Sequence, residues 1–245
     1  MLLASAALGM VAACAIAACA SAESSLLFYP THHTGTHGLA EWDEHGALLG
    51  YARPVASPHN VWLMLHGNAG QAADRAYAIS HFPPDDAVYI LEYPGYGKRG
   101  GVLSSSTFNE AAKNAYLSLR EHYPDKPVCV VGESIGTGPA SSLAGLPVPP
   151  NKIVLIVPFD KLSLVANEHV SSSPVASLMT NEWDNIAALA HYKGPVDIFG
   201  AQGDTVIPVS HAKALAAAVP ASRFTLIAGG HNDWPNSDEV KIRNP

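Results

Sequence analysis

The chain has 245 residues, 48% of them apolar, which suits one globular domain with a large core. It carries 14 Lys and Arg against 21 Asp and Glu, for a formal net charge of −7. This acidic balance, with no basic stripe in the sequence, argues against nucleic acid as a partner. The sequence also lacks internal repeats and blocks of like charge, which argues against solenoids and long charged tails.

Residues 1–22 are an uncharged apolar leader that we separate from the predicted domain, residues 23–245. Ile16-Ala17-Ala18-Cys19 resembles the bacterial lipobox, in which the cysteine is lipidated, and Ala20-Ser21-Ala22 matches a signal-peptidase site. We therefore expect an exported protein, attached to the membrane through Cys19 and facing the periplasm. A secreted or periplasmic product beginning at Glu23 and an uncleaved anchor are the alternatives, and no Lys or Arg precedes the apolar run in support of any of them.

The first predicted element of the domain is a hairpin formed by Leu39–Trp42 and Ala47–Arg53. Short runs rich in Val, Ile and Leu follow it, without the polar alternation of half-exposed strands, and therefore predict strands covered on both faces. These runs are Val61–Leu65, Ala87–Leu91, Val128–Val131, Ile153–Val157, Val196–Phe199 and Phe224–Ile227. Cys129 lies in one of these runs and is expected to be buried, with no disulfide partner in the domain.

Helical patterns alternate with these runs. One pattern starts at Thr107, which we pair with Glu110 in a capping box, and the others cover about Ala72–His81, Ile135–Leu146 and His211–Ala218. The alternation predicts an α/β fold with a mostly parallel sheet and helices on both faces. Ligands of such sheets bind at the carboxyl ends of the strands, so polar residues directly after the apolar runs are the candidates for chemistry.

One of these runs leads directly into Gly132-Glu133-Ser134-Ile135-Gly136, and a helical pattern follows. Gly-x-Ser-x-Gly between a strand and a helix is the nucleophile-elbow pattern. In so tight a turn, side chains at both glycine positions would collide with neighbouring backbone, while the serine hydroxyl is pushed into the open. The pattern predicts Ser134 as the nucleophile of an acyl-transfer reaction.

Five sequence blocks together resemble the α/β-hydrolase superfamily, and they are most similar to its small-lid branch of serine aminopeptidase-like hydrolases, esterases and depalmitoylase relatives. In chain order they are Leu65–Gly70, Glu92–Gly97, Gly132–Gly138, Gly203–Pro208 and Gly230–Asp233. The resemblance implies the α/β-hydrolase fold with a short lid, at about residues 161–194. It implies a Ser-His-Asp triad that needs no cofactor.

The residues themselves support these roles. A serine hydroxyl needs a base, and His231 follows the last apolar run on a glycine-rich loop. The imidazolium formed during attack needs a carboxylate partner, for which we choose Asp204, in the order Ser-Asp-His expected for this fold. Asp160, after the preceding strand, is the alternative acid. The main-chain N–H groups of Asn68 and Ile135 are the predicted oxyanion donors.

The predicted function is therefore hydrolysis of carboxylic esters, or of thioesters or amides, by a monomer acting on a small or lipid-like acyl substrate. Tyr96, Met179 and Trp183 are our candidates for its pocket, with packing under its own loop as the equal alternative for Tyr96. The alternatives are a serine aminopeptidase and a non-catalytic, membrane-tethered binding protein of the same fold. Few residues follow His231, so the closing helix of the fold must be short, which leaves the docking of the His231 loop in question.

His32, His33 and His37 lie close together in the sequence and are the one candidate for metal binding. No cysteine or acidic residue lies near them along the chain, so we expect no metal site.

Overall fold

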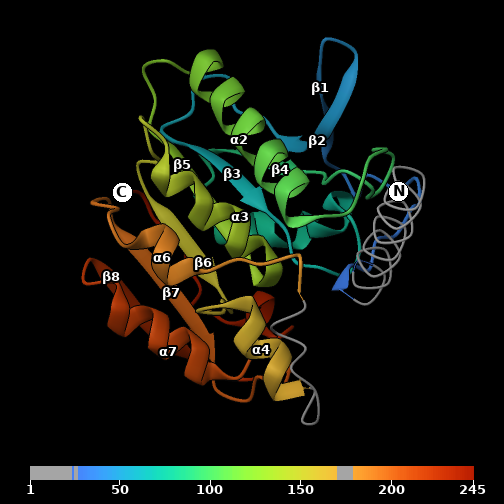
Figure 1. Ribbon diagram of the computed structural model, residues 1–245. Helices are drawn as coiled ribbons and strands as arrows, with labels where there is room; N and C mark the ends of the chain where they lie inside the picture. Colours follow the sequence, from blue (N-terminus) through green and yellow to red (C-terminus); the bar gives the residue numbers. More distant parts are fainter. Residues whose placement is uncertain (1–23, 25–26, 170–178) are drawn as a thin grey trace, which may run out of the picture.

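The apolar runs and the hairpin pair edge to edge in one sheet, shown in Figure 1. The computed structural model describes Ser24 and residues 27–169 and 179–245. Within them the sheet has eight strands in the order β1-β2-β4-β3-β5-β6-β7-β8. β1 and β2 pair antiparallel to their neighbours, and all pairs from β4 to β8 are parallel. The strands are β1 Ala40–Glu44, β2 Ala47–Arg53, β3 Val61–Leu65, β4 Ala87–Leu91, β5 Val128–Glu133, β6 Ile153–Ile156, β7 Val196–Ala201 and β8 Ser222–Ile227.

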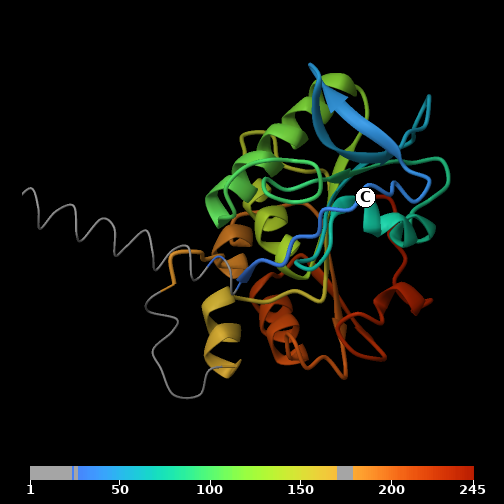
Figure 2. The same ribbon diagram turned by 90° about the vertical axis from the view of Figure 1, so that its right-hand side faces the viewer.

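Helices cover both faces of this sheet, as predicted, but different elements cover each face (Figure 2). Along β3, Val61, Leu63 and Leu65 belong to the core beneath the α-helices, whereas Trp62 and Met64 belong to a second core beneath η1 and the C-terminal segment. The helices are η1 Ala72–His81, α2 Ser105–His122, η2 Ser134–Gly136, α3 Thr137–Ser142, η3 Leu143–Gly145, α4 Leu162–His169, α6 Asn185–Leu189, α7 Val209–Ala218 and η4 Trp234–Asn236.

One predicted helix start is wrong. Helix α2 begins before Thr107, because Ser104 is its N-cap and accepts a hydrogen bond from the Thr107 N–H at 3.1 Å. The predicted capping box of Thr107 and Glu110 therefore does not start this helix. The error concerns a helix boundary, which depends on cap geometry more than on the apolar pattern. The helix expected over about Ile135–Leu146 is present as the unbroken helical run of η2, α3 and η3.

The C-terminal segment is firmly docked although its helix is short. After η4 the chain returns to η1, where the His81 ring donates to the carbonyl of Val240 at 2.7 Å and the Ile242 N–H donates to the carbonyl of His81 at 3.0 Å. Val240 and Ile242 are both buried in the second core. The closing element is therefore as short as the sequence predicted, and side-chain burial anchors it.

Some expectations concern residues that the structure leaves outside its described ranges. The leader, with Cys19 and the start of the domain at Glu23, is among them, as is 170–178 of the expected lid. On either side of that gap the lid region holds α4 and α6. Across the described residues, no helix combines the length and apolar character needed to cross a membrane.

Cys129 is buried in β5, and burial raises the pKa of its thiol to about 12.

Candidate active site

The turn between β5 and η2 places Ser134 in a conformation that few non-glycine residues adopt, with φ at 53°. The glycines on either side are required by close packing. A Cβ added to Gly132 would lie 2.6 Å from the carbonyl oxygen of Gly136, and one added to Gly136 would overlap the carbonyl oxygen of Leu65 in β3. The turn is therefore as tight as the Gly-x-Ser-x-Gly pattern predicted, and it fixes the direction of the serine side chain.

The structure brings Ser134, His231 and Asp204 into one chain of hydrogen bonds. The Nε2 atom of His231 lies 2.8 Å from the Ser134 hydroxyl oxygen, and its Nδ1 atom lies 2.7 Å from Oδ2 of Asp204. An ionised carboxylate only accepts hydrogen bonds, so the proton of a neutral ring lies on Nδ1 and Nε2 accepts from the serine. This is the tautomer that a general base needs.

The carboxylate of Asp204 is itself held by the backbone of its loop. Its second oxygen, Oδ1, accepts from the N–H groups of Val206 at 2.9 Å and Ile207 at 2.8 Å. Its loop also pairs with the His231 loop, because the Gly203 N–H donates to the carbonyl of Gly229 at 2.8 Å. The acid and the base therefore sit on two loops that hold each other in register.

Glu133, the residue before Ser134, holds a network of contacts behind the elbow. Its Oε2 accepts from the Gly67 N–H at 2.9 Å and the Arg75 guanidinium at 3.0 Å, while Oε1 accepts from Tyr77 at 3.2 Å and the Trp234 indole at 3.1 Å. Burial raises the pKa of Glu133, but the charge of Arg75 and these hydrogen bonds outweigh burial, so the pKa lies below its ordinary value. These partners come from three different parts of the chain, so no local sequence pattern indicates them.

The two predicted oxyanion donors lie at the same cavity as Ser134 and His231. Ile135 is the second residue of η2, and the first N–H groups of a helix have no partner within it. Asn68 is fixed by its side chain, which accepts from the Tyr29 N–H at 3.1 Å and from the Tyr96 hydroxyl at 3.0 Å, and donates to the carbonyl of Leu27 at 2.5 Å. These three hydrogen bonds hold the loop that carries the Asn68 N–H in place.

The cavity has a volume of about 580 Å³, and Ser134, which is 8% exposed, reaches it from the floor. Much of its wall is apolar and comes from α4, from the segment before α4 and from the N-terminal segment. These apolar lining residues are Leu27, Phe159, Leu162, Val165, Ala166, Met179, Val206 and Ile207. The cavity next to Ser134 therefore has a largely apolar wall.

Of the three predicted pocket residues, only Met179 lines this cavity. Tyr96 is fully buried and donates its hydroxyl to the Asn68 side chain. Trp183 packs against Gly138 of α3 and donates its indole N–H to Asn109 of α2 at 2.8 Å. The pocket prediction for Trp183 is therefore wrong, and for Tyr96 the structure has the second of the two predicted positions, packed inside the domain.

Similarity to known proteins agrees with this geometry. No protein-family model matches the chain. The lysophosphatidylserine lipase ABHD12 of Danio rerio is 27% identical over 196 residues, which are 72% of this chain and 49% of that protein. Alpha/beta hydrolase domain-containing protein 17B of Xenopus laevis is 27% identical over 190 residues, 75% of this chain and 64% of its own. The chain thus spans about half the length of the first curated relatives it matches.

Solved structures share the whole fold. An esterase of Pyrococcus furiosus has a TM-score of 0.64 at 14% identity, covering 85% of this chain and 95% of its own. A CIB-like hydrolase of Thermoplasma acidophilum has a TM-score of 0.59 at 17% identity, covering 83% and 95%. This chain has the α/β-hydrolase fold, and its sequence is similar to members of the α/β-hydrolase superfamily. Its fold class and its resemblance to that superfamily, both predicted from sequence motifs, are confirmed.

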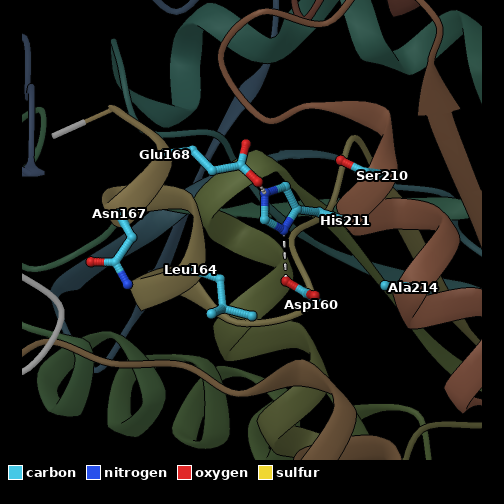
Figure 3. A pocket seen from close by; sticks show the side chains of 7 residues that line it. All are labelled: Asp160, Leu164, Asn167, Glu168, Ser210, His211 and Ala214. Carbon is cyan, nitrogen blue, oxygen red and sulfur yellow. Dashed lines mark hydrogen bonds and ion pairs between the residues drawn. The ribbon is translucent and has the colours of Figure 1, made fainter. Parts of the chain in front are cut away.

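The alternative acid, Asp160, is engaged elsewhere (Figure 3). Its Oδ1 lies 2.8 Å from Nδ1 of His211 in α7, and Nε2 of that ring lies 3.3 Å from a carboxylate oxygen of Glu168 in α4. These side chains line a separate cavity of about 390 Å³ between α4 and α7. Asp160 is therefore the partner of a second histidine, and Asp204 is the carboxylate in contact with His231.

We expect Glu133→Gln to lower the free energy of unfolding at pH 7 by about 3–5 kcal/mol, because it leaves the buried Arg75 guanidinium without its counter-charge. Urea unfolding followed by fluorescence measures the loss. Glu110→Gln is the matched control, since Glu110 is exposed on α2 and should change stability by no more than about 0.5 kcal/mol. Equal losses in both variants would contradict a special role for Glu133.

The pH dependence of this loss has a definite sign. The pKa of Glu133 is lower in the folded than in the unfolded chain, so its contribution is complete above the unfolded pKa and is lost as the pH falls through the folded pKa. The stability difference between the wild type and Glu133→Gln should therefore shrink on acidification and remain constant between pH 6 and 8. A difference that grows as the pH falls would contradict this assignment.

Proposed function

We propose that this chain is a serine hydrolase that cleaves carboxylic esters, or related thioesters and amides, through an acyl-enzyme intermediate. The observation that carries the proposal is the continuous hydrogen-bonded path from Asp204 through His231 to the Ser134 hydroxyl at the floor of a cavity. A hydroxyl hydrogen-bonded to an imidazole that is oriented by a buried carboxylate is an activated nucleophile.

The proposed reaction has two halves. The Ser134 oxygen attacks the acyl carbonyl while His231 takes the hydroxyl proton, and the ring then gives that proton to the departing alcohol. A water molecule, deprotonated by the same ring, attacks the acyl-enzyme and releases the carboxylic acid and the free serine. In both halves negative charge develops on the carbonyl oxygen, where each N–H donor, from Asn68 or Ile135, would contribute about 3–4 kcal/mol.

Esters with an apolar acyl group are the substrates that the cavity favours. Its wall is largely apolar around the serine, and burial of each methylene group contributes about 0.8 kcal/mol. The names of the similar proteins point the same way, since they include a lysophosphatidylserine lipase and an esterase. We accordingly propose acyl esters of lipid-like or small alcohols as the substrate class. We also propose that the protein acts outside the cytoplasm, because its leader sequence suggests export.

A fluorophosphonate probe should label the wild-type chain on Ser134 and leave Ser134→Ala unlabelled, because the probe reacts with serines activated by a base. Ser210→Ala is the matched control and should be labelled normally, since this exposed serine lines the separate cavity of His211 (Figure 3) and not the cavity of Ser134. The readout is in-gel fluorescence, with mass spectrometry of the labelled peptide. An unlabelled wild type would reject catalysis and favour the non-catalytic binding role.

Asp204→Asn should lower kcat for a p-nitrophenyl ester by about 10⁴-fold, because an amide in this place favours the wrong tautomer of His231. Asp160→Asn removes a carboxylate from the other histidine and should change kcat by less than about fivefold. Steady-state kinetics on the two purified variants distinguish the acids. The opposite ranking would assign the triad carboxylate to Asp160.

Acyl-chain preference should respond to the width of the cavity at α4. Ala166→Trp places a large ring on its wall, so kcat/KM for the p-nitrophenyl octanoate ester should fall about tenfold or more while that for the acetate changes by less than about threefold. Leu164→Trp on the same helix is the control, because Leu164 is exposed and lines the cavity between α4 and α7 instead of this one. A uniform loss on both esters would contradict acyl binding at this wall.

A further inference from the structure

The fold brings an acidic partner to the histidine cluster that the sequence placed alone. Nε2 of His33 lies 2.6 Å from Oδ1 of Asp74, and Nε2 of His37 lies 3.6 Å from the same oxygen. The three ligand-type atoms all lie within 4.8 Å of one another. Asp74 is 37 residues or more away in sequence, at the start of η1, which is why no local pattern indicated the contact.

We propose that His33, His37 and Asp74 form a binding site for a divalent transition-metal ion of the zinc type, which fastens the N-terminal segment 29–37 to η1. Two imidazoles and one carboxylate are the donor set that zinc takes in open sites, with water in the fourth position. This site is separate from the proposed catalytic residues and does not depend on their activity.

The two histidine–carboxylate distances lie within 1 Å of those that a small ion needs. Zinc binds nitrogen at about 2.0–2.1 Å and carboxylate oxygen at about 2.0–2.2 Å, which puts neighbouring ligand atoms of a tetrahedral site roughly 3.3 Å apart. The separation of 3.6 Å between His37 and Asp74 is already close to this value, and the His33 contact would open by less than 1 Å, since roughly 3.3 Å replaces 2.6 Å. The half-exposed histidines leave room for water as a further ligand.

The ligands are also held before any ion arrives. The backbone of His33 is gripped by the side chain of Gln71, which accepts from its N–H at 3.1 Å and donates to its carbonyl at 3.0 Å. The other carboxylate oxygen of Asp74 accepts from the Gln71 N–H at 3.1 Å, so the residue before η1 positions two of the three ligands. His37 is fixed in a left-handed turn, with φ at 49°. Such support by neighbouring groups is typical of metal sites.

Loading the site would stiffen one wall of the cavity. The segment that carries His33 pairs with the loop before η1, where the Thr31 N–H donates to the carbonyl of Gly70 at 3.0 Å. A few residues earlier, Leu27 and Tyr29 line the cavity and hold the side chain of Asn68. A metal clip at His33 and His37 would therefore tether this wall to the body of the domain.

The test is titration of the untagged, full-length chain with Zn²⁺ by calorimetry at pH 7.5, with thermal unfolding measured with and without the ion. The wild type should bind one ion per chain at this site with a Kd in the micromolar range or tighter and gain several degrees in Tm. His33→Ala, His37→Ala and Asp74→Asn should each weaken binding at least twentyfold and lose most of the Tm gain. For each variant, the Tm measured with Zn²⁺ is compared with the Tm of the same variant without it. This difference separates metal binding from any loss of basal stability.

His32→Ala is the matched control. Its ring is equally exposed in the same segment but bonds the carbonyl of Gly97 at 2.8 Å, away from Asp74, so Zn²⁺ binding should be unchanged. Mg²⁺ and Ca²⁺ should give no Tm gain, because both prefer oxygen ligands. Ser134→Ala should bind Zn²⁺ normally, which keeps this result independent of the hydrolase proposal. Wild-type binding no tighter than that of the His33→Ala, His37→Ala double variant, or an equal loss in His32→Ala, would overturn the site.

Discussion

The carboxylate of Glu133 is the contact on which the arrangement of the site depends. It sits one residue before Ser134 and binds donors from the loop after β3, from η1 and from η4, which follows His231. A buried carboxylate requires such donors, because its charge has lost the solvation of water. The same requirement draws together the loop that carries Asn68 and the segment that follows the base. The elbow and its surroundings are thus positioned by one charged group.

A comparison of the two histidine–aspartate pairs shows why only one of them suits nucleophilic catalysis. His231 with Asp204 and His211 with Asp160 have nearly equal separations, 2.7 and 2.8 Å. The difference lies at the far nitrogen of each ring. That of His231 meets the hydroxyl of Ser134, whereas that of His211 faces the carboxylate of Glu168, which offers no proton to abstract when ionised. An acid and a base become a triad only where a strained turn presents a nucleophile.

The sequence predicted the sheet and the convergence of the distant motifs well, because both follow from local patterns. Buried parallel strands are continuous apolar runs, and polar residues after them must meet at one edge of the sheet. What it could not predict were contacts made across elements. Tyr96 and Trp183 were expected in the pocket, but their orientation depends on packing against Asn68 and Gly138. The start of α2 was misplaced because Ser104, three residues earlier, offered an equally good cap.

Asp74 is a second example of a contact between distant elements that the sequence could not predict. Within its own helix it is an ordinary capping residue, whose Oδ2 accepts the Gln71 N–H. Only the pairing of the N-terminal segment with the Gly70 loop brings His33 to its other oxygen. That pairing also holds Asn68, whose side chain bonds Leu27 and Tyr29. One backbone bridge therefore links a cluster of metal-type ligands to the loop of a predicted oxyanion donor, and both depend on the same pairing of the N-terminal segment with the loop before η1.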